Sequence, residues 1–109
     1  MDSFEIIITP DAITDLLELR DYISNSLLAP DTALFYIESI RKKINTLSQM
    51  PDRVKPVEIE PWKSIGIRKI IAKNFYIYYR INQKDKQVYI LNILYNRRDQ
   101  LKQLARKRK

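Results

Sequence analysis

Residues 74–99, NFYIYYRINQKDKQVYILNILYNRRD, constrain the fold more than any other stretch of the chain. Two runs rich in β-branched and aromatic residues, 75–82 and 87–95, flank the polar loop 83–86, and this pattern predicts a β-hairpin. Side chains alternate along a strand, so every second residue of the first run shares one apolar face. The opposite face carries phenols, a guanidinium and an amide, from Tyr76, Tyr78, Arg80 and Asn82. Such a polar aromatic face, leading into paired arginines, favours a recognition surface.

The N-terminal half predicts one strand and two helices. Residues 4–8 alternate as a short strand, and Thr9 then supplies a helix cap with Pro10 at the first helical position. Apolar residues at helical spacing continue this helix to about Leu28, along a stripe of Ile13, Leu16, Leu17, Ile23 and Leu27. A second helix begins near Pro30 and extends to about Met50. The short link between them predicts an antiparallel helical hairpin.

The C-terminal half predicts three strands and a final helix. The proline-rich segment 51–63 is expected to be a loop anchored by Trp62, and residues 65–72 a strand that turns at 73–74 into the hairpin. Asn96 caps a last, mostly basic helix. The resulting order, β-α-α-β-β-β-α, predicts a single α+β domain over 1–109. In it, an antiparallel sheet carries the helical hairpin on one side and a short C-terminal helix.

Composition excludes several kinds of chemistry. The chain has no cysteine and no histidine, which removes the usual zinc ligands and the usual general base, so no metal and no cofactor are expected. Its single glycine, Gly66, rules out a glycine-rich phosphate loop. No apolar run reaches the roughly 20 residues of a membrane helix, and the start Met1-Asp2-Ser3 does not resemble a signal peptide. We therefore expect a cytoplasmic protein with no membrane partner.

The charge is unevenly distributed along the chain. Residues 1–50 contain 4 Lys/Arg against 8 Asp/Glu, whereas residues 51–109 contain 16 against 5, within a net charge of +7. A fold that groups the second set presents a positive face suited to nucleic acid or an acidic protein. An ordinary basic nucleic-acid-binding domain and a merely solvated basic surface both remain open as alternatives.

Metal-free RNA cleavage is a further possibility. It requires a base, an acid and cations beside the crowded phosphate, and a tyrosine serves as base only if neighbouring cations lower its pKa from about 10. The candidate residues for such a nuclease are Arg68, Tyr78, Arg80, Tyr95 and Arg97. The alternatives are that the tyrosines pack their rings with hydroxyls in water, and that Arg80 makes a surface ion pair.

Taken together, the motifs resemble the RelE/ParE superfamily, the toxins of type II toxin–antitoxin pairs. Residues 4–12 look like the family's first strand and the start of its first helix, and 67–81 look like its central hairpin. Residues 93–99, ILYNRRD, are similar to the ending of the family's last strand and are the most specific piece. The resemblance covers nearly the whole chain. It implies a small basic toxin that is held inactive in a hetero-oligomer with a cognate antitoxin.

The superfamily has two branches, and the resemblance favours one of them. RelE-like members cut mRNA on the ribosome, whereas ParE-like members bind DNA gyrase. Tyr76 stands where RelE-like members carry a third-strand arginine, and Gln103 stands near the position of their tyrosine in the final helix, although Arg97 does match. The resemblance therefore implies a ParE-like gyrase inhibitor, and a RelE-like, ribosome-dependent, metal-independent mRNA endonuclease is the alternative.

Two further sets of residues are candidates for binding. The basic C-terminal end is expected to contact the target through Arg97, Arg98, Lys102 and Arg106. The helical hairpin carries more apolar residues than one stripe needs, and the surplus residues, expected to bind the antitoxin, are Leu19, Tyr22 and Leu28.

Overall fold

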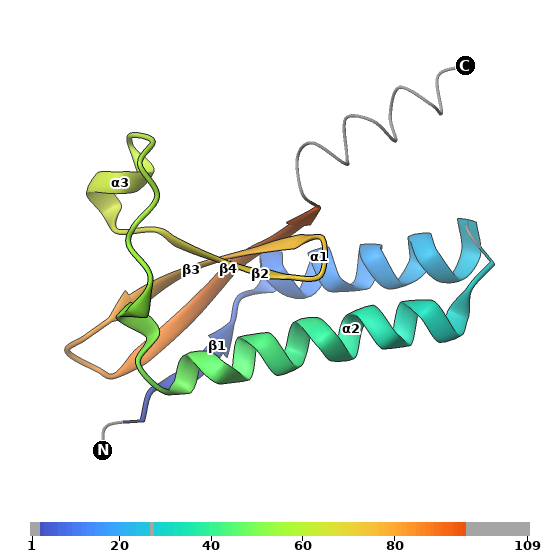
Figure 1. Cartoon of the computed structure of the whole chain (residues 1–109), viewed down its shortest axis with the longest axis horizontal. Helices are drawn as coiled ribbons and strands as arrows, with labels where there is room; N and C mark the ends of the chain where they lie inside the picture. The colour runs from blue at the N-terminus through green and yellow to red at the C-terminus, as the bar shows by residue number, and fades with distance from the viewer. Residues whose placement is uncertain (1–2, 27, 96–109) are drawn as a thin grey trace.

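The computed structural model describes residues 3–26 and 28–95 and shows a four-stranded sheet packed on two long helices (Figure 1). The strands are β1 (Glu5–Ile8), β2 (Arg68–Ala72), β3 (Phe75–Asn82) and β4 (Gln87–Tyr95), in the spatial order β1-β4-β3-β2. β2, β3 and β4 pair antiparallel, and β1 pairs parallel to β4. The predicted α+β architecture is confirmed, and the sheet is mixed because of its first strand. The predicted C-terminal helix lies outside the described residues.

The helices begin near the predicted positions but end earlier. α1 (Pro10–Asp21) continues into a π-helical turn, η1 (Tyr22–Ser26), and α2 (Pro30–Asn45) follows. The predicted first helix reached Leu28; the regular α-helix ends sooner because Ser and Asn in the segment after Asp21 compete for backbone hydrogen bonds. Beyond α2, the predicted extension to Met50 is a 3₁₀ turn, η2 (Thr46–Ser48).

Thr9 joins the start of α1 to the sheet. Its hydroxyl oxygen accepts a hydrogen bond from the Ala12 amide at 3.3 Å, and the same hydroxyl donates to the Ile90 carbonyl at 2.7 Å. The predicted cap is therefore confirmed, and its second bond ties α1 to the middle of β4. This bond fixes where the helical layer sits along the sheet.

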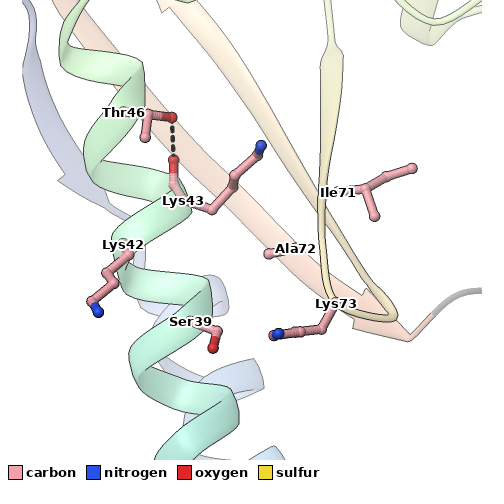
Figure 2. Close-up of a pocket in the computed structure, with 7 residues that line it drawn as sticks. All are labelled: Ser39, Lys42, Lys43, Thr46, Ile71, Ala72 and Lys73. Carbon is pink, nitrogen blue, oxygen red and sulfur yellow. Dashed lines mark hydrogen bonds between the residues drawn. The ribbon is translucent and has the colours of Figure 1, made fainter.

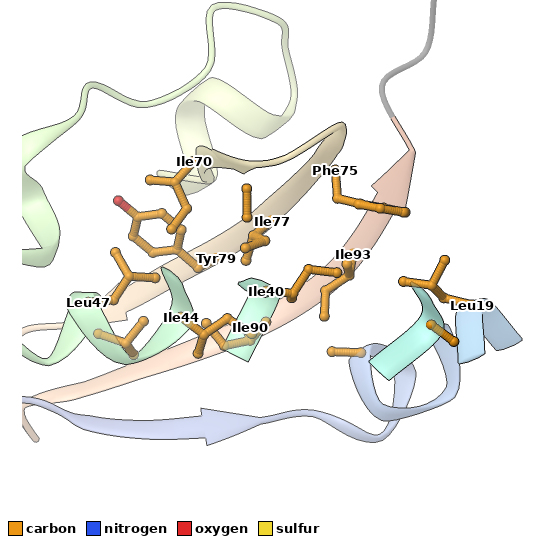
Figure 3. Close-up of a cluster of buried hydrophobic side chains, with 14 of the residues drawn as sticks. Leu19, Ile40, Ile44, Leu47, Ile70, Phe75, Ile77, Tyr79, Ile90 and Ile93 are labelled. Atoms are coloured by element: carbon orange, nitrogen blue, oxygen red, sulfur yellow. The ribbon is translucent and has the colours of Figure 1, made fainter. Parts of the chain in front are cut away.

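Both helices cover one face of the sheet and enclose the core (Figure 3). From α2, Ile40 and Ile44 meet the sheet residues Ile77 and Ile90, and all four side chains are at most 1% exposed. The opposite face of the sheet is covered by neither α1 nor α2 (Figure 1). Neither α1 nor α2, nor the short α3 (Trp62–Ile65), is long and apolar enough to cross a membrane, and these are the α-helices of the described residues.

Asp15 of α1 occupies a gap at the edge of β4. β1 covers β4 only as far as the Ile8–Ile90 pair, so the amide of Ile93 has no strand partner on that side. The Asp15 carboxylate accepts a hydrogen bond from this amide at 2.8 Å and a longer one from the Asn92 side chain at 3.4 Å. A helix side chain thus continues the ladder where the first strand ends.

Removing this carboxylate is expected to destabilise the fold. Asp15→Ala should lower the free energy of unfolding by about 1.5–3 kcal/mol, the usual cost of losing a hydrogen bond to a charged group. Glu18→Ala is the matched control, because Glu18 is exposed on the same helix, and it should change stability by less than about 0.5 kcal/mol. Urea unfolding of both variants measures the difference, and equal losses would show that Asp15 contributes nothing particular.

The segment between α2 and β2 departs from the prediction. It is not a plain loop, since it contains a 3₁₀ turn, η3 (Pro51–Arg53), and the short helix α3. Trp62 is 51% exposed and does not anchor the segment; the fully buried Pro51 lies at its start instead. β2 begins three residues later than expected because Ile65 belongs to α3, which Gly66 ends at a φ of 83°. That left-handed conformation suits glycine.

Candidate functional site

The face of the sheet away from the helices carries the polar aromatic set predicted from the sequence. We call it the open sheet face. In the pairing register, Tyr76 lies opposite Ile71, Tyr78 opposite Lys69, and Arg80 opposite Tyr89, so β2, β3 and β4 all contribute. The residues of this face are Lys69, Ile71, Tyr76, Tyr78, Arg80, Asn82, Gln87, Tyr89, Asn92 and Leu94. The predicted alternation along β3 is confirmed, because Phe75, Ile77 and Tyr79 are buried on the other side.

Cations and rings contact each other across the open sheet face. The Lys69 ammonium lies 4.3 Å from the centroid of the Tyr76 ring, and the Arg80 guanidinium lies 5.2 Å from that of Tyr89. The Tyr76 and Tyr78 rings meet nearly at right angles, with centroids 6.2 Å apart. Arg80 therefore packs on a ring, and its predicted alternative, an ion pair, does not occur among the described residues. Such an arrangement holds positive charge over flat apolar surfaces, which suits an anionic or aromatic partner.

Arg68 and Tyr79 are paired in the register on the helical side of the sheet. The Tyr79 hydroxyl is buried and donates a hydrogen bond to the Pro51 carbonyl at 2.7 Å. The Arg68 guanidinium donates to the carbonyl of Val54 in the same segment. Burial raises the pKa of Tyr79 above its ordinary value of 10.0, while Arg68 and Arg53 act in the opposite direction. Both side chains thus fasten the segment after α2 to the sheet, and Tyr79 remains protonated at neutral pH.

Of the candidate nuclease residues whose side chains the structure describes, Arg68 is separated from Tyr78 and Arg80. Tyr78 and Arg80 share the open sheet face, but Arg68 lies on the other side, bound to a backbone carbonyl. Tyr95 ends β4, where its backbone is registered with that of Phe75. Arg97 lies outside the described residues, as do the other predicted target-binding residues, Arg98, Lys102 and Arg106.

The structure also revises the apolar surplus on the helical hairpin. Leu19 is only 8% exposed and belongs to the core, and Tyr22 packs against the core, whereas Leu28 is 82% exposed. The predicted stripe of α1 was right at Ile23, which is buried, and at Leu16, which packs against the core, but its phase was off by part of a turn. It omitted Ala12, which is fully buried, and included Ile13 and Leu17, which are 46% and 45% exposed.

Four large apolar side chains on the hairpin remain about half exposed. Ile13 and Leu17 lie one turn apart on α1, and Leu34 and Phe35 are adjacent on α2, with 59% and 54% of their surface exposed. We call these four residues the hairpin patch. For α2 the sequence carried the signal, because Leu34 and Phe35 are large and apolar but fall outside the buried stripe that Ala33, Ile40 and Ile44 define.

Comparison with solved structures identifies proteins of similar fold. A chain of the chromosomal ParDE system from P. aeruginosa has a TM-score of 0.71 and 22% identity, covering 87% of this chain and 98% of that one. A chain of the RelBE2 toxin–antitoxin complex from Mycobacterium tuberculosis has a TM-score of 0.56 and 23% identity, covering 85% of this chain and 98% of that one. A mutant of the E. coli toxin RelE in the free state has a TM-score of 0.54 and 12% identity, covering 97% of both chains. The fold is therefore that of the RelE/ParE toxins.

Sequence comparison then identifies the family to which the chain belongs. No curated protein sequence gives a significant match to the chain. The family model for the ParE toxin of the type II toxin–antitoxin system parDE matches residues 6–100. The chain belongs to this ParE toxin family.

Proposed function

We propose that the protein is a toxin that stops growth by binding DNA gyrase rather than by cleaving RNA. Membership of the ParE family supports the target. The observation that carries the choice of mechanism is the separation of the two central cations, since Arg68 and Arg80 lie on opposite sides of the sheet. A phosphate held by one cannot be reached by the other, so the pair does not serve a single reacting centre.

The proposed binding mode uses surfaces on a rigid support. The open sheet face offers rings and cations fixed on paired strands, and the basic end that follows β4 adds the predicted target-binding residues Arg97 and Arg98. Contacts of this kind, between charged groups and a carboxylate or phosphate, give both affinity and orientation.

Inhibition of gyrase tests the proposal directly. The purified chain should inhibit DNA supercoiling by gyrase at micromolar concentration. A folded chain that leaves supercoiling unchanged at this concentration would refute the proposed target.

Loss of the paired arginines is expected to remove this inhibition and leave the fold intact. Arg97→Ala/Arg98→Ala should weaken inhibition at least about ten-fold, since each charge-assisted contact contributes roughly 1.5–3 kcal/mol. Lys84→Ala is the control, because it removes an exposed positive charge at the tip of the β3–β4 hairpin. Thermal melting accompanies the supercoiling assay: a variant that melts at the wild-type temperature and still inhibits fully would exclude the assigned role.

A ribosome-dependent mRNA endonuclease is the second candidate. It is favoured by one observation, namely that the phenol of Tyr78 shares the open sheet face with the cations Lys69 and Arg80. In a translation extract, primer extension would then reveal new cuts within translated codons, and Tyr78→Phe would abolish them. Intact message in the presence of toxin excludes this candidate.

We also propose a cognate antitoxin as partner, because similar folds occur in the ParDE system and in the RelBE2 complex. The hairpin patch replaces Leu19 as its docking surface, together with Tyr22 and the exposed Leu28. Exposed apolar area of this kind on a small domain commonly marks a protein interface. Each helix holds its two residues in place, since both helices pack against the core.

A further inference from the structure

A shallow, open pocket of about 400 Å³ lies between α2 and the edge strand β2 (Figure 2). Its helix side comes from four residues of α2 and the turn that follows, and its strand side comes from the end of β2 and the turn into β3. The lining residues are Ser39, Lys42, Lys43, Thr46, Ile71, Ala72 and Lys73.

The pocket is positively charged and has no counter-charge of its own. Lys43 and Lys73 extend from opposite sides into the space between helix and strand, while Lys42 points away at the rim (Figure 2). No carboxylate lines the pocket, and the ion pairs among the described residues, Arg20–Asp21 and Lys63–Glu58, lie elsewhere in the sequence. Grouped ammonium ions repel one another, and an anion between them relieves that repulsion.

The backbone and the neighbouring rings position these lysines. Lys73 stands in the tight β2–β3 turn with a φ of 57°, and its ammonium lies 4.8 Å from the centroid of the Phe35 ring. The hydroxyls donate internally, Thr46 to the Lys43 carbonyl at 2.6 Å and Ser39 to the Phe35 carbonyl at 2.9 Å. The donors left for an incoming anion are therefore the lysine ammoniums, which bind phosphate as point charges.

The open sheet face begins at β2, the edge strand that also lines the pocket. Ile71 lines the pocket and is paired in the register with Tyr76, over whose ring the Lys69 ammonium lies. A chain leaving the pocket over β2 thus passes from paired cations to an aromatic ring within one strand spacing. Proteins that bind single-stranded nucleic acid combine cations with aromatic rings in this way, so that the phosphates contact the cations and the bases stack on the rings.

We propose that the α2–β2 pocket binds a backbone phosphate of a single-stranded nucleic acid, with a neighbouring base stacked on Tyr76. The phosphate is common to DNA and RNA, and the site requires neither gyrase nor an antitoxin. It therefore goes beyond the proposed function and stands or falls separately from it.

Fluorescence anisotropy with labelled oligothymidylate and oligouridylate of about 12 nucleotides tests the site. Lys43→Gln/Lys73→Gln should weaken binding about ten-fold or more and reduce the slope of log affinity against log salt by about 0.7, as expected when one phosphate of a single strand is no longer neutralised. Lys55→Gln/Lys84→Gln is the matched control, since it removes the same charge from exposed positions outside the pocket. This control should lose much less affinity, and melting curves should show both variants folded.

Tyr76→Ala supplies the second arm. It should weaken binding of the oligonucleotides but leave binding of inorganic polyphosphate unchanged, because polyphosphate has no base to stack. Preference for one labelled oligonucleotide identifies DNA or RNA as the source of the phosphate. Equal losses in the pocket variant and its control would overturn the proposal. So would tighter competition by polyglutamate than by unlabelled oligonucleotide, since an acidic peptide would then be the better occupant.

Discussion

Tyr79→Ala is expected to lose about 3–5 kcal/mol of unfolding free energy, the usual cost of removing a large buried ring. The Tyr79 side chain is fully buried, and its hydroxyl holds the Pro51 carbonyl. Because small domains have only about 5–15 kcal/mol in total, much of the variant should be unfolded at growth temperature. Urea unfolding measures the loss, and a loss below about 1 kcal/mol would contradict the assigned role.

Tyr79→Phe isolates the hydroxyl from the ring. It should cost about 1–3 kcal/mol, because the Pro51 carbonyl is left without its partner. Tyr89→Phe is the matched control. The Tyr89 hydroxyl donates at 2.7 Å to the side chain of Gln87, a partner that water can replace, so this variant should cost less than about 0.5 kcal/mol.

Comparing the wild-type protein with Tyr79→Phe at several pH values should also reveal the raised pKa of Tyr79. Burial favours the protonated phenol, so in the unfolded chain the group ionises first, at its ordinary pKa of 10.0. Its contribution to stability is complete below that pH and is lost as pH rises through the raised pKa of the folded state. The stability difference between wild type and Tyr79→Phe should therefore be constant near neutral pH and shrink above pH 10. If the stability difference between wild type and Tyr79→Phe grew with pH, the pKa of Tyr79 would not be raised by folding.

Leu17→Asp/Phe35→Asp is expected to abolish control of the toxin by its antitoxin. Each side chain is about half exposed, so the fold should tolerate the change, but two carboxylates in an apolar interface should weaken antitoxin binding about 100-fold or more. Co-expression should then fail to restore growth. Thr14→Asp/Thr32→Asp adds the same charge at exposed positions on the same two helices and should remain neutralised. If both variants are neutralised equally well, the antitoxin docks elsewhere.

The β3–β4 hairpin was predictable to the residue at both strand boundaries, because strict alternation and a polar turn specify it locally. Which residues of β2 face the helices was not predictable, because Ile70 and Ile71 are both apolar and alternation cannot choose between them. Pairing with β3 decides it: Ile70 lies opposite the buried Ile77, and Ile71 is left 51% exposed. Arg68 consequently lies with Ile70 on the helical side, and the predicted nuclease set is divided.

Longer-range features were beyond any local pattern. The phase of α1 was missed because the fully buried Ala12 is too small for its hydrophobicity to mark it as a core position. The irregularity between Tyr78 and Tyr79 likewise arises from pairing with β4. The α2–β2 pocket joins residues that are distant in sequence, and only the packed fold places Lys43 and Lys73 around one space.

The parallel pairing of β1 with β4 has a consequence for synthesis. The first strand finds its partner only when residues 87–90 have been made, so it waits through most of translation without a ladder. Because closing a long loop has a large entropic cost, we expect this pairing to form after the helical pair and the local hairpins. A nascent chain cut short before β4 therefore lacks the strand that joins β1 and β3. Premature termination in the gene is thus expected to release fragments that do not arrest the cell, and toxicity begins only with a nearly finished polypeptide.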